Sequence, residues 1–303
     1  MNNTRNRGLL CGGMILLECI LWGTGNPLIK LMEGVIPNFL LLALRFAISF
    51  VLMMAVFGRR IVPALRQAKL RPILIASVYT AAAYILSNFG LRLAAATAAG
   101  FLMGLSVLFT PILAFLFYRQ KMHAAQWIPI VIVMAGMYLM CGAEGGFGFG
   151  IGEALALLSS AASALMLVSS ARVLEETDAM AVSAVQFAVT ALCCFICALL
   201  FEDVTVLAHV PASGWWILAY LAIGTSFFAF ILQNVGLTGV SSMYASLLMC
   251  SEPLFTAVAA YFMLGERLTL PGFIGAGLIM VSLILATLLT EKPNLLIRRK
   301  AVR

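Results

Sequence analysis

Two stretches of this chain decide the fold, because one repeats the other. Residues 83–114 read AYILSNFGLRLAAATAAGFLMGLSVLFTPILA, and residues 229–260 read AFILQNVGLTGVSSMYASLLMCSEPLFTAVAA. At an offset of 146 residues, 13 of 32 positions are identical without a gap, where about three matches are expected by chance. A weaker echo pairs Arg45-Phe46-Ala47 with Gln186-Phe187-Ala188. The pattern indicates an internal duplication.

The composition places both copies in a membrane. Hydrophobic residues make up 63% of the chain and charged residues only 10%, whereas soluble domains carry about 25% charged residues. One crossing needs about 20 apolar residues, and such runs occupy nearly the whole chain. We expect membrane helices at 8–30, 38–57, 72–92, 96–118, 124–142, 150–173, 181–201, 213–236, 241–264 and 270–290.

Five helices per copy make the duplication inverted, because an odd number of crossings turns the second half upside down. The predicted fold is an all-α integral membrane protein of ten transmembrane helices in two inverted five-helix repeats. We expect a first repeat at 1–145, a second repeat at 146–292 and a basic cytoplasmic tail at 293–303. Inverted repeats are typical of secondary transporters, whose site lies near the midplane between the repeats.

The basic residues predict the orientation. With the N-terminus inside, 15 of the 19 Lys and Arg residues fall in inner segments, as the positive-inside rule requires. Both termini are therefore predicted to be cytoplasmic in a plasma (inner) membrane. The net charge of +7 then reports topology and contact with anionic lipid, rather than nucleic-acid binding.

Other classes of protein find no support in the sequence. The first apolar run is too long for a signal peptide and contains Glu18. The seven cysteines lie within apolar stretches or at their ends and have no His neighbours, so no metal site is expected. Both histidines lie in predicted loops, and no phosphate-binding or nucleophile motif occurs. We expect no cofactor and no enzymatic activity.

Small and helix-breaking residues predict how the helices pack and end. Gly100 and Gly104, with Ala96, form a stripe of small residues whose counterparts are Ser242, Ser246 and Cys250, so we expect spans four and nine to pack closely. Gly58, Gly142 and Gly265 mark expected helix ends, and Pro72 and Pro271 mark helix starts. Pro27, Pro111 and Pro253 are expected at hinges, because proline removes a helical hydrogen bond.

Several motifs resemble the drug/metabolite transporter superfamily in its ten-helix, EamA-type form, and the resemblance covers nearly the whole chain. The first half departs from the pattern, because Tyr118-Arg119-Gln120 and Ser106-Val107 replace two of its motifs. The resemblance implies transport of amino acids, metabolites or drugs, often outward, by a monomer or homodimer. A non-transporting receptor or assembly subunit is the alternative. The motifs are Trp22-Gly23, Leu44-Arg45-Phe46, Glu252-Pro253-Leu254-Phe255 and Gly265-Glu266-Arg267.

Glu18 is the first candidate for the chemistry of transport. It lies about 15 Å along the first span, and a charge at that depth costs at least about 2.5–3.5 kcal/mol. Burial favours the protonated carboxyl, so we expect proton coupling; the small multidrug-resistance branch resembles this arrangement. The open alternative is a protonated Glu bonded to a neighbouring helix. Trp22 and Asn26 follow at a spacing of four and share its face, which suits a cationic or zwitterionic solute or serves helix packing.

The remaining candidates are less specific. Glu252 has either a substrate role or a structural role beside Pro253. Arg45 either snorkels to the surface or pairs with a buried carboxylate. Asn88 and Asn234, which are equivalent in the repeat, are expected to cap helices or to bind substrate. Tyr84 and Tyr244 are expected to line a cavity.

Overall fold

The computed structural model describes residues 2–94, 96–120, 124–142 and 150–290. The expected tail at 293–303 lies outside these ranges. The expected boundary between the repeats, at residues 145 and 146, also lies outside the described residues.

The described residues are almost entirely helical and contain no strand. Two short 3-10 helices and two π-helices interrupt or join the α-helices: η1 (Ala124–Gln126), η2 (Tyr138–Gly142), η3 (Val204–His209) and η4 (Leu221–Phe228). The α-helices are α1 (Asn2–Leu31), α2 (Asn38–Gln67), α3 (Leu70–Leu93), α4 (Ala96–Gly104), α5 (Ser106–Tyr118), α6 (Trp127–Met137), α7 (Ile151–Val173), α8 (Ala179–Phe201), α9 (Ala212–Tyr220), α10 (Ala229–Leu237), α11 (Ser242–Met249), α12 (Glu252–Leu264) and α13 (Leu270–Thr290).

These helices form the predicted set of membrane crossings. Among the described residues, nine helical stretches are long and apolar enough to span a bilayer, and a shorter apolar helix covers Trp127–Met140. The ten-helix prediction is confirmed, with the fifth crossing shorter than the rest. The chain is a multi-pass membrane protein.

The predicted end of α2 at Gly58 is wrong. The helix continues to Gln67 and contains Pro63. Arg59 and Arg60 are exposed, but Ile61 is fully buried, so packing against the core holds the helix together past the arginine pair. The predicted end at Gly265 is confirmed, because this glycine adopts a left-handed φ of 70° at the C-terminus of α12.

Two crossings are broken at equivalent positions. The fourth is interrupted at Leu105, between α4 and α5, and the ninth at Cys250 and Ser251, between α11 and α12. Leu105 and Ser251 are related by the same 146-residue offset as the repeat. Pro253 lies in the first turn of α12, whereas Pro111 lies inside α5, beyond the break. The break is therefore a property of the repeat.

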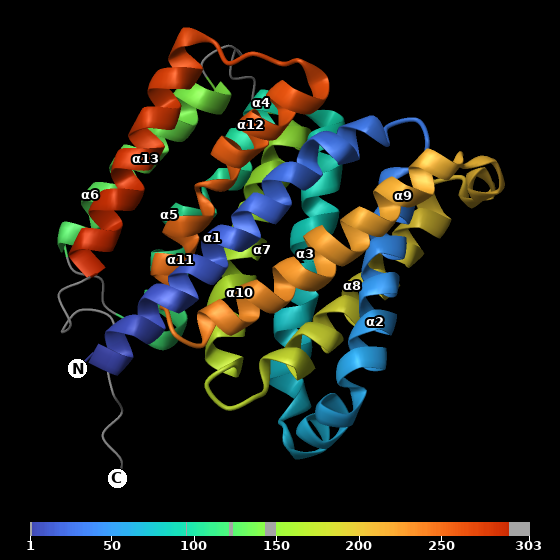
Figure 1. Cartoon of the computed structure of the whole chain (residues 1–303), viewed down its shortest axis with the longest axis horizontal. Coiled ribbons are helices and arrows are strands. Elements are labelled where there is room, and N and C mark those ends of the chain that lie inside the picture. The colour runs from blue at the N-terminus through green and yellow to red at the C-terminus, as the bar shows by residue number, and fades with distance from the viewer. Residues whose placement is uncertain (1, 95, 121–123, 143–149, 291–303) are drawn as a thin grey trace.

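The main helix contacts of one half recur in the other, and Figure 1 shows how the helices are arranged. α3 packs against α7, and the corresponding α10 packs against α1. α3 also packs against α8, and the corresponding η4 packs against α2. α1 packs against α12 as α7 packs against α5, while α2 with α8 and α6 with α13 form pairs between equivalent crossings. The fold thus consists of two inverted five-helix repeats.

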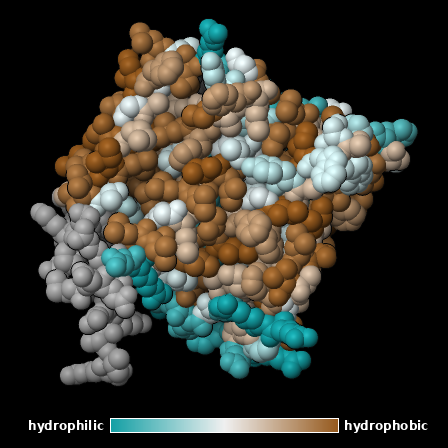
Figure 2. All heavy atoms as spheres, viewed as in Figure 1, coloured by the Kyte–Doolittle hydropathy of each residue, from teal (hydrophilic) through white to brown (hydrophobic). Residues whose placement is uncertain are grey.

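The two ends of the helical bundle carry unequal numbers of basic residues: Arg59, Arg60, Arg66, Lys69 and Arg71 lie around the α2–α3 connection, and Lys30 and Arg92 lie at the other end. At one end, ion pairs join Arg60 to Asp178 (2.5 Å) and Lys69 to Glu176 (3.8 Å), linking the α2–α3 and α7–α8 connections. We call this the basic end; hydrophilic residues line the lower edge of the molecule in Figure 2, below a largely hydrophobic face. At the opposite end, called the far end, Lys30 pairs with Glu266 at 2.6 Å.

The expected stripe of small residues does not form one continuous interface. A Cβ added at Gly104 would lie 1.8 Å from Met137 Cε, so this glycine makes room for α6, whereas one added at Gly100 would meet nothing within 4 Å among the described residues. α11, which contains Ser246, contacts α5 rather than α4. Spans four and nine therefore meet through one half of span four.

Candidate functional site at the interface of the repeats

One face of α1 binds three different elements of the second half. Glu18, Trp22 and Asn26 share this face, as predicted. Glu18 Oε1 accepts a hydrogen bond from Gln233 Nε2 of α10 at 3.0 Å. Trp22 Nε1 donates to the carbonyl oxygen of Thr225 in η4 at 2.8 Å. These two bonds join α1 to η4 and α10, and Asn26 joins it to the third element, α12.

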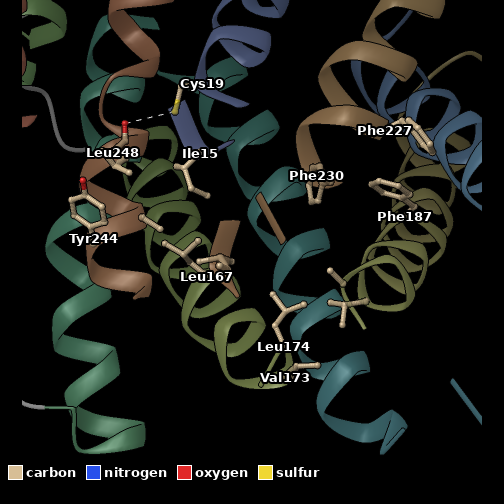
Figure 3. Close-up of a cluster of buried hydrophobic side chains, with 14 of the residues drawn as sticks. Ile15, Cys19, Leu167, Val173, Leu174, Phe187, Phe227, Phe230, Tyr244 and Leu248 are labelled. Carbon is tan, nitrogen blue, oxygen red and sulfur yellow. Dashed lines mark hydrogen bonds between the residues drawn. The ribbon is translucent and has the colours of Figure 1, made fainter. Parts of the chain in front are cut away.

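Glu18 is fully buried, and only one of its carboxyl oxygens has a partner. Its exposed fraction is 0%, and Oε2 has no hydrogen-bond partner among the described residues. The next residue, Cys19, donates its thiol to the carbonyl oxygen of Leu248 at 3.7 Å, which anchors α1 to α11 (Figure 3). Within the described residues, no ion pair engages Glu18. The free oxygen is therefore available to a proton or a ligand.

A second carboxylate contacts the same face of α1. Glu252 begins α12 directly after the helix break and is half-buried; it follows Leu248, the partner of Cys19, by four residues. Asn26 Nδ2 donates to Glu252 Oε1 at 2.9 Å and to Thr256 Oγ1 at 3.0 Å. Because Asn26 is exposed and Glu18 is buried, polar groups extend from the surface toward the centre of the molecule.

Arg45 follows neither of its two predicted arrangements. It is only 4% exposed, so it does not snorkel, and none of the ion pairs among the described residues includes it. Its guanidinium instead donates to Thr225 Oγ1 at 2.8 Å and to Ser226 Oγ at 3.2 Å. These hydroxyls lie in the π-helix η4, whose wide turn brings them to α2.

The counterpart of Arg45 makes the equivalent bond in the other half. Gln186 of α8 donates to Thr80 Oγ1 of α3 at 3.2 Å and to Ser170 Oγ at 3.0 Å. Thr80 and Ser226 are related by the 146-residue offset. The weak echo between residues 45–47 and 186–188 therefore corresponds to an equivalent contact between helices.

A symmetric group of aromatic rings lies between the repeats. Phe46 and Phe187 are equivalent residues, and so are Tyr84 and Phe230. The ring centroids of Phe46 and Tyr84 are 5.0 Å apart, and those of Phe187 and Phe230 are 5.4 Å apart; Figure 3 shows the latter two rings next to each other. Trp22 adds a fifth ring at 5.9 Å from Phe230. The rings give the interface an apolar centre beside the polar groups of α1.

The capping role expected for Asn88 and Asn234 is wrong. Both lie inside helices that continue past the following glycine. Asn234 instead joins two crossings, because its Nδ2 donates to Ser183 Oγ and to Gln186 Oε1, both at 2.8 Å. Asn88 is 8% exposed, and its Oδ1 has no partner among the described residues.

Tyr84, Tyr244 and Pro27 lie in three different parts of the structure. Tyr84 lies half-buried in the aromatic group. Tyr244 is buried, and its hydroxyl shares a hydrogen bond with Thr287 of α13 at 3.1 Å. Pro27 lies inside α1, one turn after Gly23.

Gln233, Thr225 and Thr256 were missed by the sequence analysis. All three are polar residues in apolar crossings, which was the available signal. Gln233 stands at the position of Ser87 in the first copy. A comparison of the two copies at the positions where their residues differ could therefore have identified it. The partners themselves could not be found, because Glu18 and Gln233 are 215 residues apart in sequence.

Comparisons with known proteins agree with this architecture. A model of the EamA-like transporter family matches residues 9–142 and 150–288, and the chain belongs to this family of membrane transporters. A crystal structure described only as a protein has a TM-score of 0.80 and 23% identity, covering 94% of this chain and 98% of that one. At this identity the likeness shows a common fold.

Two named relatives are transporters. The chain is 26% identical over 187 residues to the "Uncharacterized transporter YwfM" of Bacillus subtilis, covering 58% of this chain and 59% of the relative. It is 40% identical over 83 residues to the "Uncharacterized inner membrane transporter YicL" of Salmonella typhimurium, covering 26% and 27%. The aligned part is thus less than two thirds of each relative.

Proposed function

We propose that this protein is a secondary active transporter that exports small polar organic solutes by alternating access and couples the movement to protons at Glu18. The single observation that carries the proposal is the buried Glu18 carboxyl, with one unpartnered oxygen at the interface of two inverted repeats. An ionisable group inside a membrane is costly and is kept where it binds an ion or a solute.

The surroundings favour a solute with a positive charge. Glu18 lies on the face of α1 whose Asn26 binds Glu252, and no ion pair among the described residues engages either carboxylate. Trp22 and Phe230 present aromatic rings nearby, and aromatic faces attract cations. We infer a cationic or zwitterionic organic solute, such as an amino acid, a metabolite or a drug.

The basic residues and a named relative support a location and an orientation for the protein. The relative from Salmonella is named as an inner membrane transporter, and Arg59, Arg60, Arg66, Lys69 and Arg71 lie on or beside the α2–α3 connection. We infer that the protein lies in the plasma (inner) membrane with the basic end and both termini in the cytoplasm. We propose that the repeats divide at residues 145 and 146, in a monomer or a homodimer.

Reconstitution with a pH gradient tests the proposal. A thermal-shift screen of amino acids and organic cations on the purified protein supplies the solute, and its flux is then measured in proteoliposomes. Wild-type flux should respond to an imposed pH gradient, whereas Glu18→Gln, which cannot release a proton, should lose this response. Glu266→Gln is the matched control, because Glu266 is half exposed and pairs with Lys30 at the far end.

Two results would contradict the proposal. Equal stimulation of wild type and Glu18→Gln by the pH gradient would remove proton coupling at this residue. An absence of saturable flux with every solute in the screen would remove the transporter assignment for this chain and leave a receptor or assembly role.

A further inference from the structure

Three pairs of equivalent residues surround the interface of the repeats, and they do not make equivalent bonds. Gln186 corresponds to Arg45, Asn234 to Asn88, and Ser226 to Thr80. The bonds Arg45–Ser226 and Gln186–Thr80 are present in both halves. The bond between Asn234 and Gln186 is present, but no counterpart joins Asn88 to Arg45.

The Asn234 bond lies near the basic end. α10 runs toward this end and finishes three residues after Asn234, while α8 starts there at Ala179. The Asn234 amide donates to Ser183 and Gln186 on the first two turns of α8 at 2.8 Å. These bonds hold α8 and α10, the seventh and eighth crossings, together on the basic side of the midplane.

The equivalent place near the far end is unbonded. α3 runs toward the far end and finishes at Leu93, shortly after Asn88, while α2 starts there at Asn38. Asn88 makes no side-chain hydrogen bond among the described residues, and its Oδ1 is buried without a partner there. Asn234 Oδ1 is also without a partner among these residues, but the Asn234 amide nitrogen donates two bonds. A buried carbonyl oxygen left unpaired costs free energy, so Asn88 would gain from a donor that arrives in another conformation.

Arg45 is the donor that the repeat places opposite Asn88. It occupies the position of Gln186, and a guanidinium carries five N–H donors. Only two bonds to Thr225 and Ser226 are seen here. In an inverted repeat, exchanging the conformations of the two halves interconverts the two facing states, so the arrangement now held by α8 and α10 passes to α2 and α3.

We propose that Asn88 is a positioning residue of the transport cycle, which accepts a hydrogen bond from Arg45 in the facing state opposite to the one described here. In that state the Asn234–Gln186 bond is broken, the basic end opens and the far end closes. The inference rests on the proposed alternating access and adds to it the pair of bonds that alternate. The present structure is then the state closed at the basic end.

Distances between spin labels test the exchange without any solute. Labels at Glu175 and Thr238 report the basic end, and labels at Glu33 and Arg92 report the far end; double electron–electron resonance measures both distances in reconstituted protein whose native cysteines are replaced. Asn88→Asp offers Arg45 a charge-assisted bond. It should lengthen the basic-end distance and shorten the far-end distance, shifting the ratio of the two populations roughly tenfold.

Two further variants test the same exchange, so that the result does not depend on Asn88→Asp alone. Asn234→Leu removes the bond that holds the basic end and should shift the populations in the same direction as Asn88→Asp. Asn88→Leu, which removes the acceptor, should keep the wild-type distances or reduce the opposite state further.

The outcomes separate this inference from the proposed function. If wild type shows two distance populations but Asn88→Asp and Asn234→Leu leave their ratio unchanged, the exchange between Asn88 and Asn234 is refuted while alternating access stands. If wild type and all variants show one unchanging distance at each end, alternating access itself is refuted, and the exchange with it.

Discussion

At residue 23, α1 has no side chain, and α12 fills the space. A Cβ added to Gly23 would lie 2.6 Å from Phe255 Cβ and 2.8 Å from the backbone nitrogen of Thr256. One turn later, Asn26 reaches Thr256 and Glu252 on the same helix. The close approach at Gly23 therefore sets the distance at which these polar contacts form.

Gly23→Ala should destabilise the protein. The added methyl group meets backbone and Cβ atoms that cannot rotate away, and overpacking of this kind costs about 1–3 kcal/mol. The melting temperature of the purified protein in detergent should fall. Gly100→Ala is the matched control, since a Cβ there meets nothing within 4 Å; equal melting temperatures for the two variants would refute the packing role of Gly23.

Single residues of the site were only partly predictable. Glu18, Trp22 and Asn26 could be placed on one face from their spacing alone, because helical periodicity is a local property. Their partners belong to the second half and depend on packing across the repeat interface. Arg45 was misread for the same reason: its partners are hydroxyls of a π-helix, a local widening that periodicity does not reveal.

The start of α2 depends on a residue from another helix. Pro37, which precedes α2, makes no side-chain cap. The Glu202 carboxylate, at the end of α8, accepts instead from the backbone nitrogens of Phe39 at 2.9 Å and Leu40 at 2.8 Å. A negative charge at a helix N-terminus also interacts favourably with the helix dipole. Glu202 thus holds α2 and α8 together at the far end.

Glu202→Ala should loosen the far end. It leaves two N–H groups of the first turn of α2 without their acceptor, and losing a cap costs about 0.5–2 kcal/mol. Thermal unfolding should shift to lower temperature, and amide exchange at Phe39 and Leu40 should become faster. Glu33→Ala is the control, because Glu33 lines the same surface pocket as Glu202 at the far end; a loss of stability as large as that of Glu202→Ala would contradict the capping role.

The helices themselves were predicted well, and their interruptions were not. Long apolar runs identify crossings because each must fill the bilayer. The break at Leu105 has no proline beside it, and the end of α2 at Gln67 lies beyond an arginine pair. The break at Leu105 recurs at the equivalent residue, Ser251. The last part of α2 contains Ile61, which is buried against the core.

Most of the described basic residues lie at one end of the molecule. Arg60 and Lys69 on the α2–α3 side face Asp178 and Glu176 on the α7–α8 side. These loops come from different halves, so the charge asymmetry belongs to the folded bundle and not to one repeat. Under the positive-inside rule, this is the end that we propose to face the cytoplasm.

A reporter fused after Arg303 tests this orientation. Green fluorescent protein should be fluorescent at this position, and alkaline phosphatase should be inactive, because one folds in the cytoplasm and the other requires the oxidising outer side. The same reporters placed within the 201–212 connection should behave in the opposite way. Active phosphatase after Arg303 would reverse the assigned orientation.

Arg45 and Gln186 occupy equivalent places but are different residues. If the two halves were identical, a molecule that alternates between facing states would have two states of equal free energy, and it would rest equally in both. Each unlike pair removes part of that degeneracy, because a guanidinium and an amide stabilise their surroundings to different degrees. The resting orientation is then set by the positions where the copies have diverged, and Arg45 and Gln186 are one such pair.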